Sequence, residues 1–491
     1  MRRTAILVSL LVGGIAAQGP KLPLFRDAVS TSLPAGPGYS VDAAFGDADG
    51  DEDVDLVIGR LELARVKGQN LLLRGFRTSG SPPWIPGWPD NIRPMTENRK
   101  VAVGIVGAGF LADIRGRCYG ALPGASVLAV VARSRASAEG WASRHGKVRV
   151  CAELEELLAL GEIDVVDLCV PNHLHRSMAA AAAAAGKHVI CTKPLTAYVG
   201  QDLEDGASDA DVASCDRRTM LRVATADAVA LLDAARAGGV RLMYGESWVY
   251  APSIARARDL LETAGGAVLE VRGWEGHNGS HSPYSKVWRY GGGGALLRLG
   301  THPLGAMIHL KRQEGLARDG KAIRPVSVTA ELGELSQNPS LDEGNTFIAT
   351  GWKDVENWGC AILRFEDGSR GVAYGSDNVL GGMESKLEIM ASNCHFKCNL
   401  SPNDMLRAYA PDNRVFGDAY LMEKVDSKAG WSTPMPSEDW CSGHLAMLAD
   451  FVDAVAEDRP PLSDGTLGLE VTRVIYGAYL SAAEGRRIEL H

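Results

Sequence analysis

The chain has 491 residues, of which 46% are hydrophobic and 23% are charged. This balance is typical of a globular protein with a large core and excludes collagen-like, low-complexity and polytopic membrane classes. A formal net charge of -9 at pH 7 leaves no basic surface for nucleic-acid phosphates, so we expect no nucleic-acid partner.

Residues 1–18 resemble a secretory signal peptide. Arg2 and Arg3 precede an apolar run from Ala5 to Ala17, which is too short to span a bilayer, so we expect no stable membrane span. A buried N-terminal helix is the alternative. Translation from Met1 would give an exported or periplasmic protein. Met95, which precedes a polar lead-in to an apolar run, is a second possible start, and from it the protein would stay cytoplasmic.

Residues 19–94 are rich in Pro and Gly and show no regular helical or strand period. Around Gly50 they carry alternating acidic side chains, the oxygen ligands that suit calcium. The pattern resembles a single FG-GAP repeat of integrin-type β-propellers; a solvated acidic loop without metal is the alternative. We hypothesise that residues 1–94 are a fused fragment that contributes nothing to the chemistry. The candidate calcium ligands are Asp47, Asp49, Asp51, Asp53 and Asp55.

All nine cysteines follow residue 95, and no CxxC pair occurs. The count is odd, and several lie in apolar runs, as Cys169 does. We therefore expect buried free thiols in a reducing compartment rather than a disulfide framework.

An apolar run, Val101–Val106, leads directly into a GxGxxA motif. Gly107 permits a tight turn, Gly109 lets the backbone approach a pyrophosphate, and Ala112 allows close helix packing. The first peptides of the following helix, at Phe110 and Leu111, supply free N–H groups for a phosphate. A dinucleotide site is predicted here.

The next predicted strand, Val127–Ala132, ends where an NAD enzyme usually offers an acidic residue to the ribose. This chain offers Arg133-Ser134-Arg135 instead. Arg133 and Ser134 suit a 2'-phosphate, so NADP is favoured over NAD. Solvated arginines are the alternative.

Two further predicted strands end in polar loops. Pro171, Asn172 and His175 follow one strand, and Lys193-Pro194 follows the other. Ligands bind at the carboxyl ends of parallel strands, where a lysine can polarise a substrate oxygen during hydride transfer. A lysine that caps a strand end in solvent is the alternative.

From about residue 99 to 491 the chain resembles the Gfo/Idh/MocA oxidoreductases. The resemblance implies an α/β protein with an N-terminal Rossmann domain, residues 95–252, and a C-terminal α/β domain, residues 253–491. The second domain would have an open, mostly antiparallel sheet that often mediates homo-oligomers. The motifs that carry it are the GxGxxA start, Pro171-Asn172 with His175, Lys193-Pro194, Tyr250-Ala251-Pro252 and Gly300-Thr301-His302.

The resemblance also implies roles for individual residues. Lys193 would orient the reacting hydroxyl, and His302 would accept and donate its proton. Tyr250 would lie on the substrate side. The positions on the cofactor side are Gly107, Gly109, Ala112, Pro171, Asn172 and His175.

Three positions depart from the family pattern. Thr192, Arg298 and Gly305 stand where the family often has Glu, Asp and Asp. We expect a more cationic pocket, in which Arg298 binds an acidic or carboxylated sugar-like substrate.

The polar and aromatic run from Trp274 to Tyr284 suits carbohydrate recognition, with His281 as a substrate contact. A metal site at His277 and His281 is a weaker alternative because Gly279 and Pro283 favour a loop, and a structural turn is a third possibility.

The predicted function is an NADP- or NAD-dependent oxidoreductase. It would transfer a hydride between nicotinamide and a hydroxyl-bearing carbon of a small carbohydrate-like substrate: a sugar, polyol or sugar acid. The alternatives are a cofactor-assisted glycosidase or epimerase of the same fold and a non-catalytic NAD(P)-binding sensor. For residues 19–94 alone, a secreted calcium-binding module is a further alternative.

Overall fold

The structure is a computed structural model that describes residues 100–280, 282–401, 406–425 and 427–490. Before residue 100 it describes the backbone of four short strands, paired in two antiparallel hairpins: β1 (Ala44–Gly46) with β2 (Asp55–Val57), and β3 (Leu63–Val66) with β4 (Gln69–Leu72). The signal-like residues 1–18, Met95 and the aspartates at 47, 49, 51 and 53 lie outside the described residues, as does the side chain of Asp55. The signal and calcium predictions therefore stay predictions.

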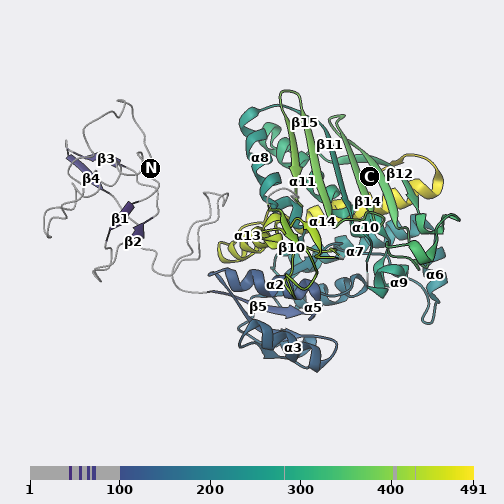
Figure 1. Cartoon of the computed structure of the whole chain (residues 1–491), viewed down its shortest axis with the longest axis horizontal. Helices are drawn as coiled ribbons and strands as arrows, with labels where there is room; N and C mark the ends of the chain where they lie inside the picture. The colour runs from purple at the N-terminus through teal and green to yellow at the C-terminus, as the bar shows by residue number, and fades with distance from the viewer. Residues whose placement is uncertain are drawn as a thin grey trace. The chain divides into compact units, whose positions relative to one another are not determined.

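The chain divides into two units, Met1–Pro86 and Gly87–His491. The second unit begins with a six-stranded parallel sheet in the order β10-β9-β8-β5-β6-β7 (Figure 1). The first and fourth strands along the chain, β5 and β8, are neighbours, which is the doubly wound order, and ligands bind beyond the carboxyl ends of strands at such a switch point. The strands are β5 (Val101–Val106), β6 (Ala125–Val131), β7 (Arg149–Val150), β8 (Val165–Leu168), β9 (His188–Thr192) and β10 (Leu242–Gly245).

Helices alternate with these strands, which confirms the predicted Rossmann domain. All six residues of β5 are buried, as expected for a strand covered on both faces. The helices are α2 (Phe110–Ala121), α3 (Arg135–His145), α4 (Leu154–Leu158), α5 (His175–Ala184), α6 (Asp209–Ser214) and α7 (Arg217–Ala237), with a 3-10 turn η2 (Asn172–Leu174).

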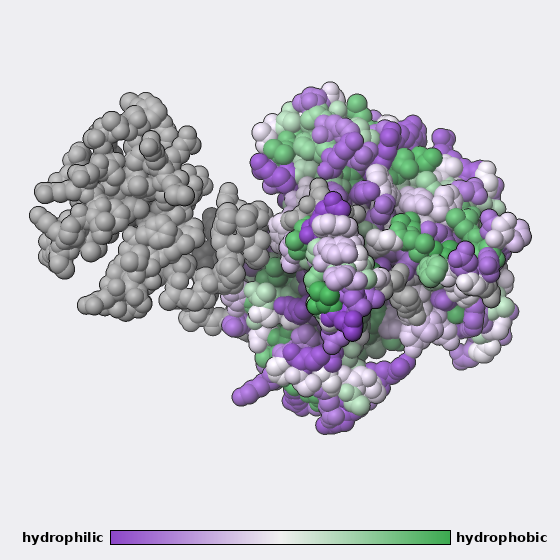
Figure 2. Space-filling model, viewed as in Figure 1, coloured by the Kyte–Doolittle hydropathy of each residue, from purple (hydrophilic) through white to green (hydrophobic). Residues whose placement is uncertain are grey.

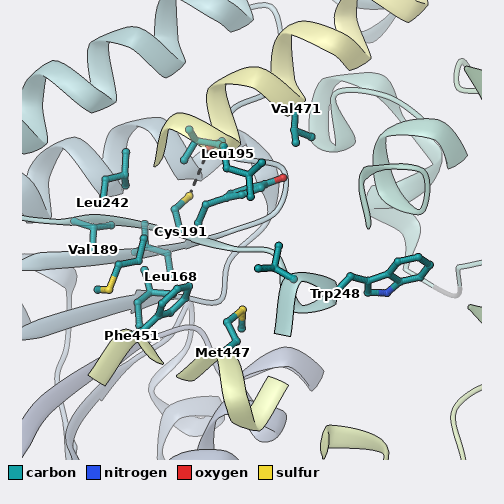
Figure 3. Packing of buried hydrophobic residues seen from close by; sticks show 14 of the residues in the cluster. Leu168, Val189, Cys191, Leu195, Leu242, Trp248, Met447, Phe451 and Val471 are labelled. Carbon is teal, nitrogen blue, oxygen red and sulfur yellow. Dashed lines mark hydrogen bonds between the residues drawn. The ribbon is translucent and has the colours of Figure 1, made fainter. Parts of the chain in front are cut away.

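The C-terminal helices α13 (His444–Ala456) and α14 (Gly465–Glu484) return to cover this sheet. Figure 3 shows Met447 and Phe451 of α13 on one side of the strand residues Val189 and Cys191, and Val471 of α14 on the other. All five are at most 1% exposed. The two domains therefore share one hydrophobic core.

The second sheet has seven strands in the order β16-β15-β11-β14-β13-β12-β19. Only β11 and β14 pair in parallel; the other neighbours are antiparallel. This confirms the predicted mostly antiparallel sheet. Its strands are β11 (Val268–Gly276), β12 (Pro325–Gly333), β13 (Trp358–Phe365), β14 (Arg370–Ser376), β15 (Glu384–Ala391), β16 (His395–Asn399) and β19 (Ile488–Glu489).

Helices cover one face of this sheet and leave the other open. Helices α11 (Thr301–Asp319) and α14 pack on the covered face. On the open face Thr329, Ile362, Val372 and Arg272 stand side by side across four strands, and the Ile362 side chain is 49% exposed. In the view of Figure 2 hydrophobic residues form separate patches between hydrophilic ones.

The remaining elements are short connectors around the two sheets, with the exception of α8. They are η3 (Ser247–Tyr250), α8 (Pro252–Ala264), η4 (Pro283–Lys286), α9 (Trp288–Gly291), α10 (Ala295–Arg298), η5 (Leu335–Gln337), η6 (Glu343–Asn345), β17 (Ala408–Ala410), β18 (Gly430–Ser432) and α12 (Glu438–Cys441).

All nine cysteines are free thiols, as predicted, and five of them are buried. Among the described residues, no helix has the length and apolar character needed to cross a membrane.

Candidate active site

The turn between β5 and α2 has the shape that a dinucleotide needs. Gly107 has a φ of 116°, and an added Cβ would collide with the carbonyl oxygen of Cys169, so only glycine fits there. At Gly109, by contrast, an added Cβ would meet no protein atom within 4 Å. No side chain caps the N-terminus of α2, so the first N–H groups of this helix, at Phe110 and Leu111, are available to a pyrophosphate.

Arg133 and Ser134 stand beyond the carboxyl end of β6 and differ in their freedom to bind a ligand. The Ser134 hydroxyl accepts a hydrogen bond from the Ser137 backbone N–H at 3.3 Å and so caps α3. Arg133 is exposed, and its Nη1 donates to the Tyr284 hydroxyl at 2.6 Å. Arg133 is therefore the residue of this pair with donors to spare for a cofactor ribose or phosphate.

Residues 282–294, which we term the strap, join the C-terminal domain to these strand ends. Besides the Arg133–Tyr284 bond, Asn172 Nδ2 donates to the Gly291 carbonyl at 2.7 Å, and the rings of His173 and Tyr290 meet edge to face at 5.7 Å. The strap thus reaches the ends of β6 and β8, which flank β5. A dinucleotide bound at Gly109 would lie beside it.

His175 does not face a ligand, contrary to the predicted cofactor contact. Its side chain is fully buried, with Nδ1 at 2.8 Å from the Pro194 carbonyl and Nε2 at 3.1 Å from the Val170 carbonyl. Burial lowers its pKa. The ring ties the loop after β8 to the loop after β9, so its role is to hold Asn172 and Lys193 in place.

Lys193 lines a cavity of about 170 Å³ at these strand ends. Its Nζ donates to the backbone carbonyl of Arg298, and burial lowers its pKa. Among the described residues that line the cavity, Lys193 and Arg298 are the charged ones. The lining residues are Pro171, Asn172, Lys193, Pro194, Ser282, Tyr284, Ser285, Tyr290, Gly291 and Arg298.

His302 lies in the first turn of α11 and meets a carboxylate that follows β10. Its Nδ1 is 2.7 Å from Oε1 of Glu246, a fully buried residue. Burial raises the Glu246 pKa to about 8, with Lys193 acting in the opposite direction. Burial and then the charge of Lys193 lower the His302 pKa to about 3. Lys193, Glu246 and His302 thus form one electrostatic cluster.

Two more carboxylates reach this region from the second sheet. Glu275 lies in β11 and Asp377 directly follows β14, and the parallel pairing of these strands brings their ends together. Asp377 is fully buried and pairs with the Arg298 guanidinium, which also lies over the Trp352 ring at 5.1 Å. Burial raises the pKa of both carboxyls.

These carboxylates add to the picture of a cationic pocket: the cavity wall carries Lys193 and Arg298, and buried acids lie beside them. The sequence lacks acids at positions 192, 298 and 305, but Glu246, Glu275 and Asp377 supply three from other segments. Glu246 is the one that the sequence could have revealed, because it directly follows β10 (Leu242–Gly245), which ends at the same sheet edge as Lys193.

The glycine-rich segment before Arg298 is held by Glu356. Its carboxylate accepts the N–H groups of Gly294 and Leu296, each at 3.0 Å, and the Tyr479 hydroxyl at 2.8 Å. An added Cβ on Gly294 would collide with the Glu356 carbonyl. This anchoring sets the start of α10, from which Arg298 projects, and leads into α11.

Tyr250, for which a substrate role was predicted, uses its hydroxyl within the protein. Its hydroxyl donates to Asp450 at 2.7 Å and accepts the Ser463 backbone N–H at 2.9 Å. Tyr250 therefore ties η3 to α13 and to the loop before α14.

His281 lies outside the described residues, so its substrate role stays a prediction. His277 accepts the Gly279 backbone N–H on Nδ1 at 2.9 Å, which fits the structural turn. Among the described residues, no group of three or more His, Cys, Asp or Glu side chains is placed to hold a metal ion.

Models of known protein families match both of the domains that contribute residues to this site. Residues 101–213 match "Oxidoreductase family, NAD-binding Rossmann fold", and residues 254–397 match "GFO/IDH/MocA C-terminal domain". The chain carries both domains of the Gfo/Idh/MocA oxidoreductase family. As a Gfo/Idh/MocA protein it is an NAD(P)-dependent oxidoreductase, and the matched Rossmann domain, which contains the β5–α2 turn, is NAD-binding.

Relatives of known name cover most of the chain. Levoglucosan dehydrogenase of Pseudarthrobacter phenanthrenivorans is 26% identical over 394 residues, which are 74% of this chain and 92% of the relative. The crystal structure of GenD2 from gentamicin A biosynthesis in complex with NAD is 26% identical over 81% of this chain and 99% of that one, with a TM-score of 0.65. A levoglucosan dehydrogenase complex with NADH and L-sorbose, 21% identical, shares the fold at a TM-score of 0.58 over 80% of this chain and 100% of that one.

Proposed function

We propose that this Gfo/Idh/MocA protein interconverts a secondary alcohol and a ketone on a sugar, polyol or sugar acid, with Lys193 and His302 as the catalytic residues. The observation that carries the proposal is that Lys193 lines a cavity at the carboxyl ends of the Rossmann strands and lies close enough to His302 to act on its pKa. A nicotinamide cofactor held at the β5–α2 turn would supply the hydride chemistry, as acceptor of the carbinol hydride in oxidation and as its donor in reduction.

Lys193 binds the reacting oxygen. Its ammonium group, directed by the Arg298 carbonyl, donates a hydrogen bond to the substrate hydroxyl and stabilises negative charge on that oxygen as the C–H bond breaks. The product is a carbonyl, whose oxygen keeps the same hydrogen bond.

His302 moves the proton. During oxidation the O–H bond of the substrate breaks, and the proton passes to Nε2, which makes no hydrogen bond within the described part of the chain. The low pKa of His302, about 3, keeps the ring neutral and able to accept. During reduction Nε2 gives a proton to the carbonyl oxygen.

A hydroxyl-rich substrate fits the walls of the cavity. Ser282, Ser285, Tyr284 and Tyr290 contribute hydroxyl groups and aromatic edges. Relatives named "Inositol 2-dehydrogenase" from Rhodococcus erythropolis, 33% identical over 103 residues, and levoglucosan dehydrogenase support the same class. A sugar acid is supported by the two cations on the wall, Lys193 and Arg298, although Asp377 offsets one of them.

NADP is the favoured cofactor. Arg133 replaces the usual acid beyond β6, and its neutral partner Tyr284 leaves the charge of the guanidinium uncompensated. A 2'-phosphate there would gain charge-assisted hydrogen bonds.

The open face of the second sheet supports a homo-oligomer. Its half-exposed Ile362, flanked by Val372, is the apolar centre of the row described above. Ile362→Glu would place a charge at the centre of this face. The molar mass of the variant, measured by light scattering, should then fall below that of the parent protein, whereas equal masses would argue against this face as the subunit interface.

Residues 1–94 take no part in this chemistry. The chain beginning at Met95 would bind cofactor as the full chain does, and loss of binding on deletion would refute this. Mass spectrometry of the mature protein from its native host would show which start is used, and therefore whether the protein is exported or cytoplasmic.

The test is to mix the purified protein with NADP+ or NAD+ and panels of sugars, polyols and sugar acids. We expect net formation of NAD(P)H, faster with NADP+. Retained cofactor without net NAD(P)H would mark a glycosidase or epimerase, and binding without any turnover would mark a sensor; either result would replace the proposal.

A further inference from the structure

Glu246 is a buried acid that neither catalytic role uses. It directly follows β10, and its carboxylate is enclosed between the ends of β9, β10 and α11. Oε1 accepts the Trp248 backbone N–H at 3.1 Å and contacts His302 Nδ1 at 2.7 Å. Oε2 is buried without a hydrogen-bond partner within the described part of the chain.

The absence of a side chain at Gly305 makes room for this carboxylate. Gly305 lies one helical turn after His302 on α11, and an added Cβ would lie 2.6 Å from Cγ and 3.1 Å from Cδ of Glu246. A side chain from position 305 and the Glu246 side chain would therefore occupy the same space. Glu246 thus brings a carboxylate next to His302 from the end of β10 rather than from α11 itself.

The ring of His302 is held from two sides. Glu246 contacts Nδ1, and the Trp248 ring lies nearly parallel to the imidazole, with an interplanar angle of 17° and centroids 5.8 Å apart. Trp248 belongs to the hydrophobic cluster drawn in Figure 3, where it lies at one edge of the view, and it is 3% exposed. Nε2 is the nitrogen left for the substrate.

We propose that Glu246 is the positioning residue that sets the tautomer of His302, and thereby which direction of the alcohol–ketone reaction His302 can serve. The proposal rests on the function proposed above. Ionised Glu246 accepts a hydrogen bond from Nδ1–H, which leaves a lone pair on Nε2 to take the hydroxyl proton. Protonated Glu246 donates to Nδ1, which leaves Nε2–H to protonate a carbonyl. Either way one proton crosses between substrate and Nε2, and one lies between Nδ1 and Glu246.

The direction of the pH dependence follows from the raised Glu246 pKa of about 8. Above that pH the ionised form dominates and oxidation is favoured; below it the protonated form dominates and reduction is favoured. Other titratable groups also face the pair, so an activity profile alone does not isolate Glu246. They are Lys193 after β9, Tyr244 in β10, Glu275 in β11, Glu423 before α12 and His444 in α13.

The experiment therefore reads the tautomer directly. Protein labelled with 15N-histidine is titrated across pH about 8, and the signals of His302 are assigned by their loss in His302→Asn. We expect the protonated nitrogen to change from Nε2 to Nδ1 as pH rises. In Glu246→Gln, whose amide does not ionise, we expect no such change. A change that persists in Glu246→Gln would overturn the proposal.

Glu470→Gln is the matched control. Glu470 is a buried acid on α14, 6% exposed and paired with Arg324 at 3.3 Å, and it lies outside the catalytic cluster. In the Glu470→Gln variant we expect the His302 signals and the pH profile of oxidation to match those of the parent protein. A loss of the tautomer change in this control would mean that any buried acid affects it, which contradicts a specific role for Glu246.

A relocated carboxylate gives a second test. Glu246→Ala is expected to lower kcat for oxidation by about 100-fold, at the lower end of general-base effects. In the double variant Glu246→Ala/Gly305→Asp, the new carboxylate enters the space vacated beside Nδ1, so we expect about tenfold recovery. A folded double variant with no recovery would contradict the proposal. If the parent protein oxidises no sugar yet shows the tautomer change, the proposed function fails while the Glu246–His302 relation stands.

Discussion

The nucleotide end of the site, at the β5–α2 turn, and its catalytic end, around Lys193 and His302, are built from different kinds of chemical group. At the nucleotide end, backbone groups form the site: the Gly107 turn, the open space at Gly109 and the first peptides of α2. At the catalytic end, ionisable side chains that are buried or partly buried form it, with Lys193, Glu246 and Asp377 drawn from three separate strand ends. Substitutions at the two ends should therefore have different effects. At the nucleotide end they should change the backbone shape and the affinity for the cofactor, and at the catalytic end they should change the charge and the turnover rate.

The largest expected effect is at the catalytic end. Lys193→Ala removes the donor to the reacting oxygen, so kcat/KM should fall by about 1000-fold, while the Kd for NADP+ should change by less than about threefold. Steady-state rates and tryptophan fluorescence quenching measure the two quantities. Lys147→Ala, at an exposed position, is the control. Equal losses of NADP+ binding and turnover in Lys193→Ala would contradict the separation of the site into a nucleotide end and a catalytic end.

Asp377→Asn tests whether the catalytic end depends on paired charge. The substitution leaves the guanidinium of Arg298 in a largely buried place without its ionised partner, and breaking such a pair costs about 3 kcal/mol of unfolding free energy. Urea unfolding measures the loss. Asp412→Asn, whose partner Arg414 is on the surface, should leave stability unchanged. A small loss in Asp377→Asn would mean that solvent already screens Arg298.

A pair of glycine substitutions separates fold from binding at the nucleotide end. Gly107→Ala forces a Cβ into the Cys169 carbonyl at positive φ and should cost about 2 kcal/mol or more. Gly109→Ala meets no protein atom, so its melting temperature should match that of the parent protein while cofactor Kd rises about tenfold. Unchanged affinity in Gly109→Ala would place the cofactor elsewhere.

The smallest expected effect concerns cofactor choice. Arg133→Ala should raise the Kd for NADP+ about tenfold, the size of a charge-assisted hydrogen bond to phosphate, and leave the Kd for NAD+ nearly unchanged. Tyr284→Phe removes the neutral partner of Arg133 but keeps its charge, so NADP+ affinity should be retained. If Arg133→Ala weakens both cofactors equally, Arg133 supports the strap rather than a 2'-phosphate.

The contrast between the two ends also explains what the sequence could predict. The strands of the Rossmann domain, the GxGxxA turn and the position of Lys193 follow from local patterns, because each lies on consecutive residues. The pairing of Asp377 with Arg298, across 79 residues of sequence, depends on the packing of α10 against β14. The missing acids at positions 192, 298 and 305 predict a cationic pocket, and the cavity wall carries Lys193 and Arg298. The acids that folding brings beside these cations could not be predicted from those three positions.

Tyr250 and His175 show a second limit. Both lie in motifs that resemble the family, yet their polar atoms are used by Asp450 and Ser463 and by backbone carbonyls. A motif shows that a residue is placed near the site, whereas its hydrogen bonds decide whether it is free to bind a ligand.

The most direct test of the central claim is a single-turnover transfer experiment. The parent protein and Lys193→Ala are loaded with NADP+ and mixed with sugars, polyols and sugar acids deuterated at the carbinol carbons, and the cofactor is recovered for mass spectrometry. We predict deuterium on the nicotinamide from the parent protein and almost none from Lys193→Ala. Bound cofactor that gains no deuterium from any of these substrates would contradict the assignment of an alcohol-oxidising site at Lys193 and His302.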